Sequence, residues 1–194
     1  MKKRDHLALG RFLIDKIGTD RLINHRKAFL LGCIEPDCNF LTYCRGFSLS
    51  DRFPGHTARI AEKLILKCIS RFAVSGLSTA LDYFILGTLL HYAADAFTGA
   101  HNAFMDFTLA EHLAYENELH EMIEKQLLSD ISIASPCFLD EFFITKHSEY
   151  VKSNHSVEID AHYIILVTAS LLSGILAYEK GRGTNEGAYY YRLV

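Results

Sequence analysis

Two pairs of histidine and carboxylate residues, with a single histidine between them, have the spacing of metal ligands. His91 and Asp95 are four residues apart, as are His112 and Glu116, and His101 lies between the pairs. Residues four apart share one face of a helix, so each pair would present an imidazole beside a carboxylate. Imidazole and carboxylate ligands without thiolates suit zinc in tetrahedral or five-coordinate sites. The spacing therefore predicts a zinc site.

The central carboxylate of such a cluster can bridge two ions. Two metal ions roughly 3.5–4 Å apart clamp both oxygens of an in-line displacement at phosphorus. Asp95 is central among the candidates, and we expect it to be the bridge.

The elements that must position these residues are helices. Thr79 with Asp82, and Thr108 with Glu111, have the pattern of capping boxes at helix starts. Each histidine–carboxylate pair falls within one of the two helices that these boxes predict. The expected helices cover residues 5–17, 24–35, 55–72, 79–97 and 108–128, a segment that begins at Ser135–Pro136, and 157–180.

The chain shows no alternating strand pattern, which predicts an all-α protein with a single compact multi-helix domain over residues 1–194. We expect Asp5 to cap the first helix. The second helix should stop before Pro36, which would leave Asp37 just past a helix end. Ser135–Pro136 should open the sixth helix, with the proline at its first position.

Composition narrows the function. The net charge of −3 gives no basic field for a phosphate backbone, so no long nucleic acid is expected as a partner. Five cysteines without paired spacing indicate reduced thiols, and no signal peptide is visible, so we expect a cytoplasmic protein. The apolar segments 79–98 and 157–178 carry charged residues, and we interpret them as buried core helices and not as transmembrane segments.

The ordered set of candidate ligands resembles the zinc-dependent phospholipase C family, which shares its fold with the single-strand-specific zinc nucleases of fungi and plants. The resemblance covers roughly residues 6 to 116 and implies that fold here. The matching positions are His6, Pro36-Asp37, Gly55-His56-Thr57, His91-Tyr-Ala-Ala-Asp95, His101-Asn102 and His112-Leu-Ala-Tyr-Glu116.

The resemblance implies two zinc ions, with a third as a further hypothesis. The first ion would be held by Asp37, His56, His91 and Asp95. The second, more accessible ion would be held by His101, His112 and Glu116. The third would take His6, the other oxygen of Asp95, and the amino and carbonyl groups of Met1.

The third site depends on the amino terminus. In secreted relatives this terminus is exposed by processing and usually carries a tryptophan, whereas this chain begins Met1-Lys2 and contains no tryptophan. Because Lys2 is bulky, we expect the initiator methionine to remain. Its amine would then chelate the ion together with His6.

The resemblance also implies a mechanism. The substrate would be a phosphate ester, and by kinship a phospholipid. A metal-bound hydroxide would attack phosphorus in line with the departing alcohol. Asp37 is the candidate general base, a role that the sequence does not separate from that of ligand.

Ordinary structural roles and other functions stay open. Asp37 could end a turn after Pro36, and His6 could be an ordinary first-turn residue. His120 could contact a ligand from outside the site, although a solvent-facing partner for a neighbouring glutamate is the simpler interpretation. The alternative functions are a nuclease or small-molecule phosphatase on the same metal core, and a non-catalytic interaction protein that zinc stabilises.

Overall fold

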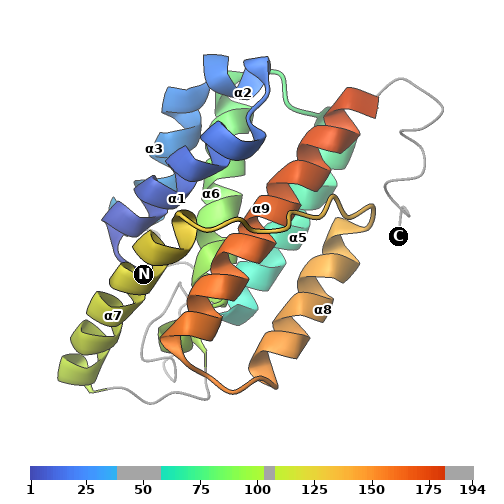
Figure 1. Ribbon diagram of the computed structural model, residues 1–194. Helices are drawn as coiled ribbons and strands as arrows, with labels where there is room; N and C mark the ends of the chain where they lie inside the picture. The colour runs from blue at the N-terminus through green and yellow to red at the C-terminus, as the bar shows by residue number, and fades with distance from the viewer. Residues whose placement is uncertain (39–57, 103–107, 182–194) are drawn as a thin grey trace.

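The computed structural model describes residues 1–38, 58–102 and 108–181, and these ranges form helices with no strand (Figure 1). The all-α fold class is thereby confirmed. The α-helices in these ranges are α1 (Lys3–Ile17), α2 (Asp20–Asn24), α3 (Arg26–Cys38), α5 (Ala58–Ser75), α6 (Ala80–Ala96), α7 (Leu109–Leu127), α8 (Leu139–Val151) and α9 (Val157–Gly181), and the 3₁₀ helix η1 (Gly99–His101) lies between α6 and α7.

Helix α6 is the central helix of the bundle. It packs against α3, α5 and α9, and Figure 1 shows it between α1–α3 on one side and α5 and α8 on the other. Twelve of its 17 residues are buried, including His91 and Asp95 in its last two turns. A helix that is apolar on all sides belongs in a core. The polar pair therefore sits on the most enclosed element of the fold.

Two glycines let α3 and α6 approach each other closely. A Cβ on Gly32 would lie 2.0 Å from the carbonyl oxygen of Phe84, and one on Gly87 would lie 2.1 Å from that of Phe29. Only glycine fits where two backbones approach this closely. This contact brings the end of α3, which carries Asp37, beside the last turns of α6.

Helix α9 is the other strongly apolar element. Of the helices that the structure describes, it alone is long and apolar enough to cross a membrane, judged by length and composition. Within its apolar window, 72% of the residues are buried inside the fold. Burial of α6 and α9 agrees with the expectation that both are core helices.

Both predicted capping boxes are present. The hydroxyls of Thr79 and Thr108 accept the backbone N–H groups of Asp82 and Glu111, whose carboxylates accept the threonine N–H groups in return. As predicted, the two helices end near residues 97 and 128. The start expected near residue 55 for the third helix lies outside the described residues.

The expected end of α1 at residue 17 is confirmed, but the expected start of α1 and the expected end of α3 were wrong. Helix α1 begins at Lys3, and Asp5 lies inside its first turn, where its carboxylate accepts the backbone N–H of Lys2 at 3.2 Å. Helix α3 continues through Pro36 to Cys38. Proline removes one helical hydrogen bond, and this loss is tolerated near the helix end. Asp37 therefore lies within the last turn and not after it.

The other two boundary errors concern α2 and α8. The helix expected from residue 24 is preceded by the short α2, which Thr19 caps, and α3 starts only at Arg26. Helix α8 starts at Leu139, because the Ser135–Pro136 segment packs across α9 instead of opening a helix. The Ser135 hydroxyl bonds that of Ser173, and the Pro136 carbonyl oxygen lies 2.8 Å from where a Cβ on Gly174 would be.

Asp82 caps the start of α6, so its removal should destabilise the fold. One carboxylate oxygen accepts the N–H and hydroxyl of Thr79 at 2.9 and 2.7 Å, and the other accepts Arg71 at 2.7 Å. We expect Asp82→Ala to lower the free energy of unfolding by about 2–4 kcal/mol in urea titrations at pH 7. Asp130→Ala should change it by less than about 0.5 kcal/mol, because Asp130 is fully exposed.

The effect of Asp82→Ala should depend on pH. Burial works against the charge, but hydrogen bonds from Thr79 and Arg71 outweigh it and lower the pKa of Asp82 below its ordinary value of 3.8. A depressed carboxyl pKa stabilises the fold above the unfolded-state pKa, and this stabilisation is lost as the pH falls towards the folded-state value. The difference between wild type and variant should therefore shrink below about pH 4. A difference that grew in acid would refute this assignment.

Candidate metal centre

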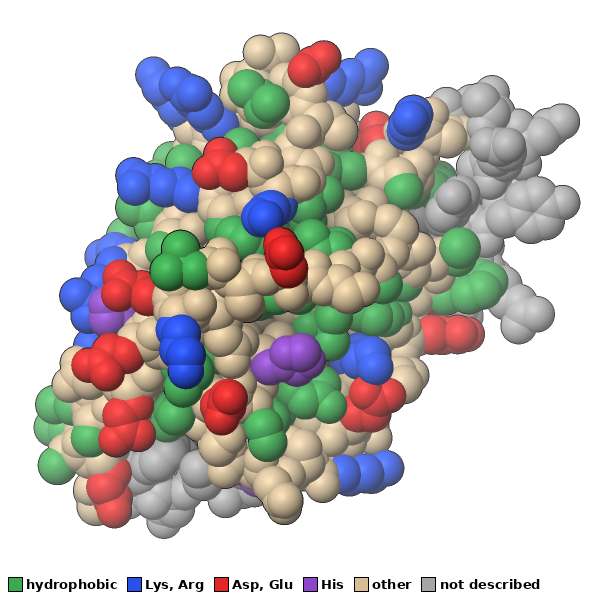
Figure 2. Space-filling view, viewed as in Figure 1, with side chains coloured by type: hydrophobic (Ala, Val, Ile, Leu, Met, Phe, Trp, Pro, Cys, Tyr) green, Lys and Arg blue, Asp and Glu red, His purple; other side chains and the backbone are tan. Residues whose placement is uncertain are grey.

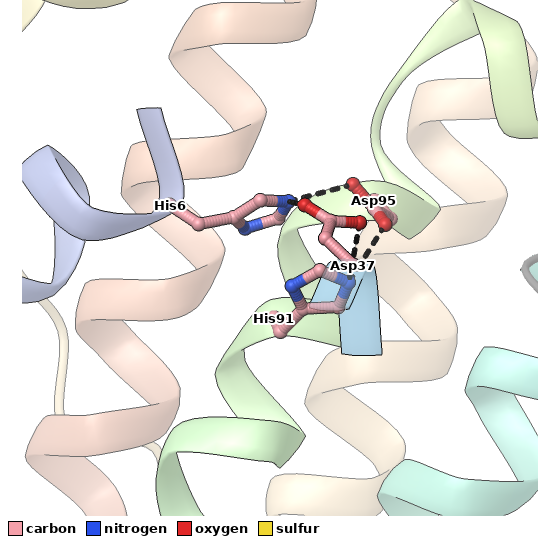
Figure 3. A group of neighbouring side chains, drawn as sticks. All are labelled: His6, Asp37, His91 and Asp95. Atoms are coloured by element: carbon pink, nitrogen blue, oxygen red, sulfur yellow. Dashed lines mark ion pairs between the residues drawn. The ribbon is translucent and has the colours of Figure 1, made fainter. Parts of the chain in front are cut away.

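Four side chains from three helices meet at the end of the bundle where α3 and α6 terminate. Each contributes one potential ligand atom, and these atoms all lie within 4.8 Å of one another. Figure 3 shows the side chains pointing towards one another from α1, α3 and α6. The group consists of His6, Asp37, His91 and Asp95.

The distances in this group fit a shared cation better than direct hydrogen bonds. The Nε2 atoms of His6 and His91 lie 3.2 Å from the two oxygens of Asp95, one on each. The same nitrogens lie 3.8 and 3.7 Å from the oxygens of Asp37. Two ligands of a tetrahedral zinc ion, each at about 2.0–2.1 Å, are about 3.4 Å apart, whereas a typical N–H···O bond is about 2.9 Å long. The residues therefore fit the metal.

The backbone sets the tautomer of His91. Its Nδ1 lies 2.9 Å from the carbonyl oxygen of Cys33, and a carbonyl only accepts, so Nδ1 carries the proton. Nε2 then has the lone pair that a metal needs. The rings of His6 and His91 stack at 3.9 Å, so both Nε2 atoms face the carboxylates.

Burial and neighbouring charges shift the pKa values of the groups in the centre in opposite directions. Burial, together with the nearby His91, lowers the pKa of His6 to about 3, so His6 is neutral and able to coordinate. Burial also disfavours a charge on His91, but Asp95 and Asp37 raise its pKa. The pKa of Asp95 lies well below its ordinary value, because the surrounding positive groups outweigh burial. An anionic Asp95 and a neutral His6 match the protonation states that metal binding requires.

The amino terminus lies inside the same centre. The Met1 nitrogen is 3.6 Å from an oxygen of Asp95 and 3.6 Å from an oxygen of Glu116. Burial opposes its charge, but these two carboxylates raise its pKa. A metal ion at this position would have to displace a proton from the amine.

The remaining candidates lie around Asp95 and Glu116. Nε2 of His101 is 3.8 Å from Asp95, and Nε2 of His112 is 3.7 Å from Glu116. The Thr98 hydroxyl donates to the carbonyl of Asp95 at 2.8 Å, so its oxygen accepts Nδ1–H of His101 at 2.7 Å. Nε2 of His101 is then the ring nitrogen that could coordinate a metal.

Eight of the nine ligands predicted from sequence lie in the described residues, and contacts of 3.2–3.8 Å link them into one centre. His56 lies outside the described residues. The eight are Met1, His6, Asp37, His91, Asp95, His101, His112 and Glu116.

The sequence analysis missed some of the residues that contact or orient the candidate ligands, and it did not predict every contact of His120. His120 was expected to be a solvent-facing partner of a neighbouring glutamate, and its Nε2 does lie 3.5 Å from Glu124. Its Nδ1, however, lies 2.5 Å from the buried carboxylate of Asp5, a contact that was not expected. Thr98 and the carbonyl of Cys33 orient ligand rings, and no sequence signal marks them. Such partners depend on how the helices pack.

A comparison with known families agrees with this geometry. A family model described as "Zinc dependent phospholipase C" matches residues 5–157. The chain belongs to this family. It is therefore a hydrolase, and the family implies zinc as its metal and phospholipid as its substrate. No curated protein and no solved structure matched the chain.

Proposed function

We propose that this enzyme hydrolyses phosphate diesters at a cluster of two or three zinc ions, with phospholipids as the substrate class. The supporting observation is the position of Asp95. Each of its oxygens lies 3.2 Å from a different imidazole nitrogen, so one carboxylate can serve two ions. Shared carboxylates are typical of hydrolases that use paired ions at phosphorus.

The ligands divide among the ions as the family resemblance implies. Asp37, His56, His91 and Asp95 would hold the first ion. His101, His112 and Glu116 would hold the second. His6, the other oxygen of Asp95 and the Met1 amine would hold the third. The contacts of Met1 with Asp95 and Glu116 support placing the amino terminus in the cluster.

Differences in burial indicate which side of the centre meets the substrate. The side chains of His6, His91 and Asp95 are at most 3% exposed, whereas those of Asp37, Glu116 and His112 are 17–22% exposed. A phosphodiester would therefore approach from the side of these last three residues. The buried ligands exclude water from the opposite side.

The proposed reaction is the attack of a water molecule on the phosphorus of the diester. Bound zinc neutralises charge on phosphate oxygens and lowers the pKa of water. Asp37 accepts the proton of the attacking water at one of its carboxylate oxygens. The water oxygen bonds to phosphorus as the bond from phosphorus to the alcohol oxygen breaks. The departing alkoxide takes up the proton that Asp37 received, so the alcohol leaves neutral and Asp37 is again a carboxylate. For a phospholipid the products are a diacylglycerol and a phosphorylated head group.

We also propose that the enzyme is cytoplasmic. Four cysteines in the described residues are free thiols: Cys33, Cys38, Cys68 and Cys137. Reduced thiols, two of them exposed at Cys38 and Cys137, suit a reducing compartment. The enzyme would then meet the inner leaflet or soluble diesters.

A hydrolysis panel tests the proposed function. Protein purified without added zinc would be analysed for metal and assayed on phosphatidylcholine, bis-p-nitrophenyl phosphate and single-stranded DNA. We expect chelator-sensitive hydrolysis of the first two substrates. Preference for DNA would favour a nuclease, although basic and acidic side chains are interspersed on the face shown in Figure 2 and form no basic groove there. Bound zinc with no turnover of any substrate would refute the proposal.

The Met1 amine gives a separate prediction. Two residues, Gly-Ser, added before Met1 would move the amine away from Asp95 and Glu116, so we expect the loss of one zinc per chain and a fall in kcat/KM of about 10–100-fold. The same dipeptide added after residue 194 is the matched control and should change neither quantity. Unchanged metal content and activity in the first variant would remove Met1 from the ligand set.

A further inference from the structure

A buried carboxylate outside the candidate ligand set connects three elements near the centre. Asp160, in the first turn of α9, is 1% exposed. Its oxygens accept the hydroxyl of Tyr115 at 2.5 Å, the hydroxyl of Tyr150 at 2.8 Å and the N–H of Gly99 at 3.1 Å. All three partners donate, so the site is built for an acceptor-only carboxylate.

Two of these partners belong to the segments that carry ligands. Tyr115 immediately precedes Glu116 on α7, and Gly99 opens η1, which ends at His101. The oxygen of Tyr115 also accepts the N–H of Gly99 at 2.9 Å. Together, the carboxylate of Asp160 and this phenol fix η1 against α7.

Hydrogen bonds within the turn also hold it together. Thr98 bonds the ring of His101, and the side-chain amide of Asn102 donates to the carbonyls of Ala96 and Thr98 at 2.9 and 2.8 Å. These bonds connect the ring of His101 to the backbone of the turn. Asp160 and Tyr115 connect the turn to α7.

We propose that Asp160 is a positioning residue for the second zinc ion, holding His101 in place relative to His112 and Glu116. This inference rests on the proposed function, because it requires that these three residues bind zinc. Partners that orient ligands typically change metal affinity 10–100-fold when they are removed. Asp160 lies beyond residue 157, where the family match ends.

The test is a zinc competition titration with a chromogenic chelator on the full chain, which resolves each zinc affinity. The zinc-binding step that is present in the titration of wild type and absent in that of His112→Ala is the binding of the second ion. Asp160→Asn keeps the size of the side chain but places an amide NH₂ group, a donor, next to three groups that also donate. We therefore expect the affinity for the second zinc ion to fall about 10–100-fold, while the affinity for the first ion is unchanged.

A pair of tyrosine variants provides the matched control. Tyr115→Phe and Tyr150→Phe each remove one hydroxyl from the same carboxylate, but only Tyr115 also contacts Gly99. Tyr115→Phe should weaken the second zinc at least threefold more than Tyr150→Phe does. If Asp160→Asn does not fold, as judged by circular dichroism, this pair decides the question by itself.

The outcomes separate this inference from the proposed function. Wild type without bound zinc would overturn the proposed function. Wild type with zinc, and a folded Asp160→Asn with unchanged affinities, would overturn only the positioning role. Equal weakening of every zinc would also overturn it, because a general structural defect would not select one ion.

Discussion

Asp95→Asn is expected to lower kcat/KM on bis-p-nitrophenyl phosphate by about 10³-fold or more, and to remove at least one zinc per chain. The substitution removes the negative charge that faces two imidazole nitrogens at 3.2 Å and leaves a neutral amide at a position where the side chain is only 3% exposed. Stabilisation of phosphate charge by bound ions amounts to several kcal/mol, and about 4 kcal/mol corresponds to 10³-fold in rate.

The control for this variant is Asp130→Asn, which makes the same chemical change at a fully exposed carboxylate. It should retain wild-type activity and metal content. Zinc content would be measured by inductively coupled plasma mass spectrometry on both proteins after gel filtration. An Asp95→Asn enzyme with full activity would mean that the centre is not where the reaction occurs.

Removing the metal is expected to lower the thermal unfolding midpoint by about 10 °C. An ion present at about 1,000 times its dissociation constant stabilises the native state by about 4 kcal/mol, and 1 kcal/mol shifts Tm by about 2–4 °C in a protein of this size. Without the ion, the buried carboxylate of Asp95 loses the metal charge that would balance its own. Differential scanning calorimetry with and without chelator measures the shift.

The chelator-dependent shift in Tm should also be measured for two variants. Asp82→Ala should start from a lower Tm but show the same chelator-dependent shift, because Asp82 caps α6 at the end opposite His91 and Asp95. Asp95→Asn should show a much smaller shift. Identical midpoints for wild type with and without chelator would show that the metal contributes nothing to the fold.

The helices that carry the ligand pairs were predictable because their signals are local. Thr79 with Asp82, and Thr108 with Glu111, mark helix starts, and a four-residue spacing fixes a shared face wherever the segment is helical. These two rules place His91 beside Asp95 and His112 beside Glu116 without knowledge of the tertiary structure.

The features missed from sequence depend on packing between distant segments. Helix α3 runs through Pro36 because a proline near a helix end sacrifices only one hydrogen bond. Its distance from α6 depends on Gly32 and Gly87, whose roles appear only when two backbones meet. Asp160 lies 61 residues from Gly99, and no periodicity in either segment connects them.

Binding of a common cluster of zinc ions by His91, Asp95, His112 and Glu116 can be tested by anomalous X-ray diffraction on either side of the zinc absorption edge. We predict an anomalous difference peak about 2.0–2.2 Å from Nε2 of His91 and from an oxygen of Asp95, with a second peak beside His112 and Glu116. A zinc-loaded crystal with no peak among these residues, or with peaks only elsewhere, would contradict it.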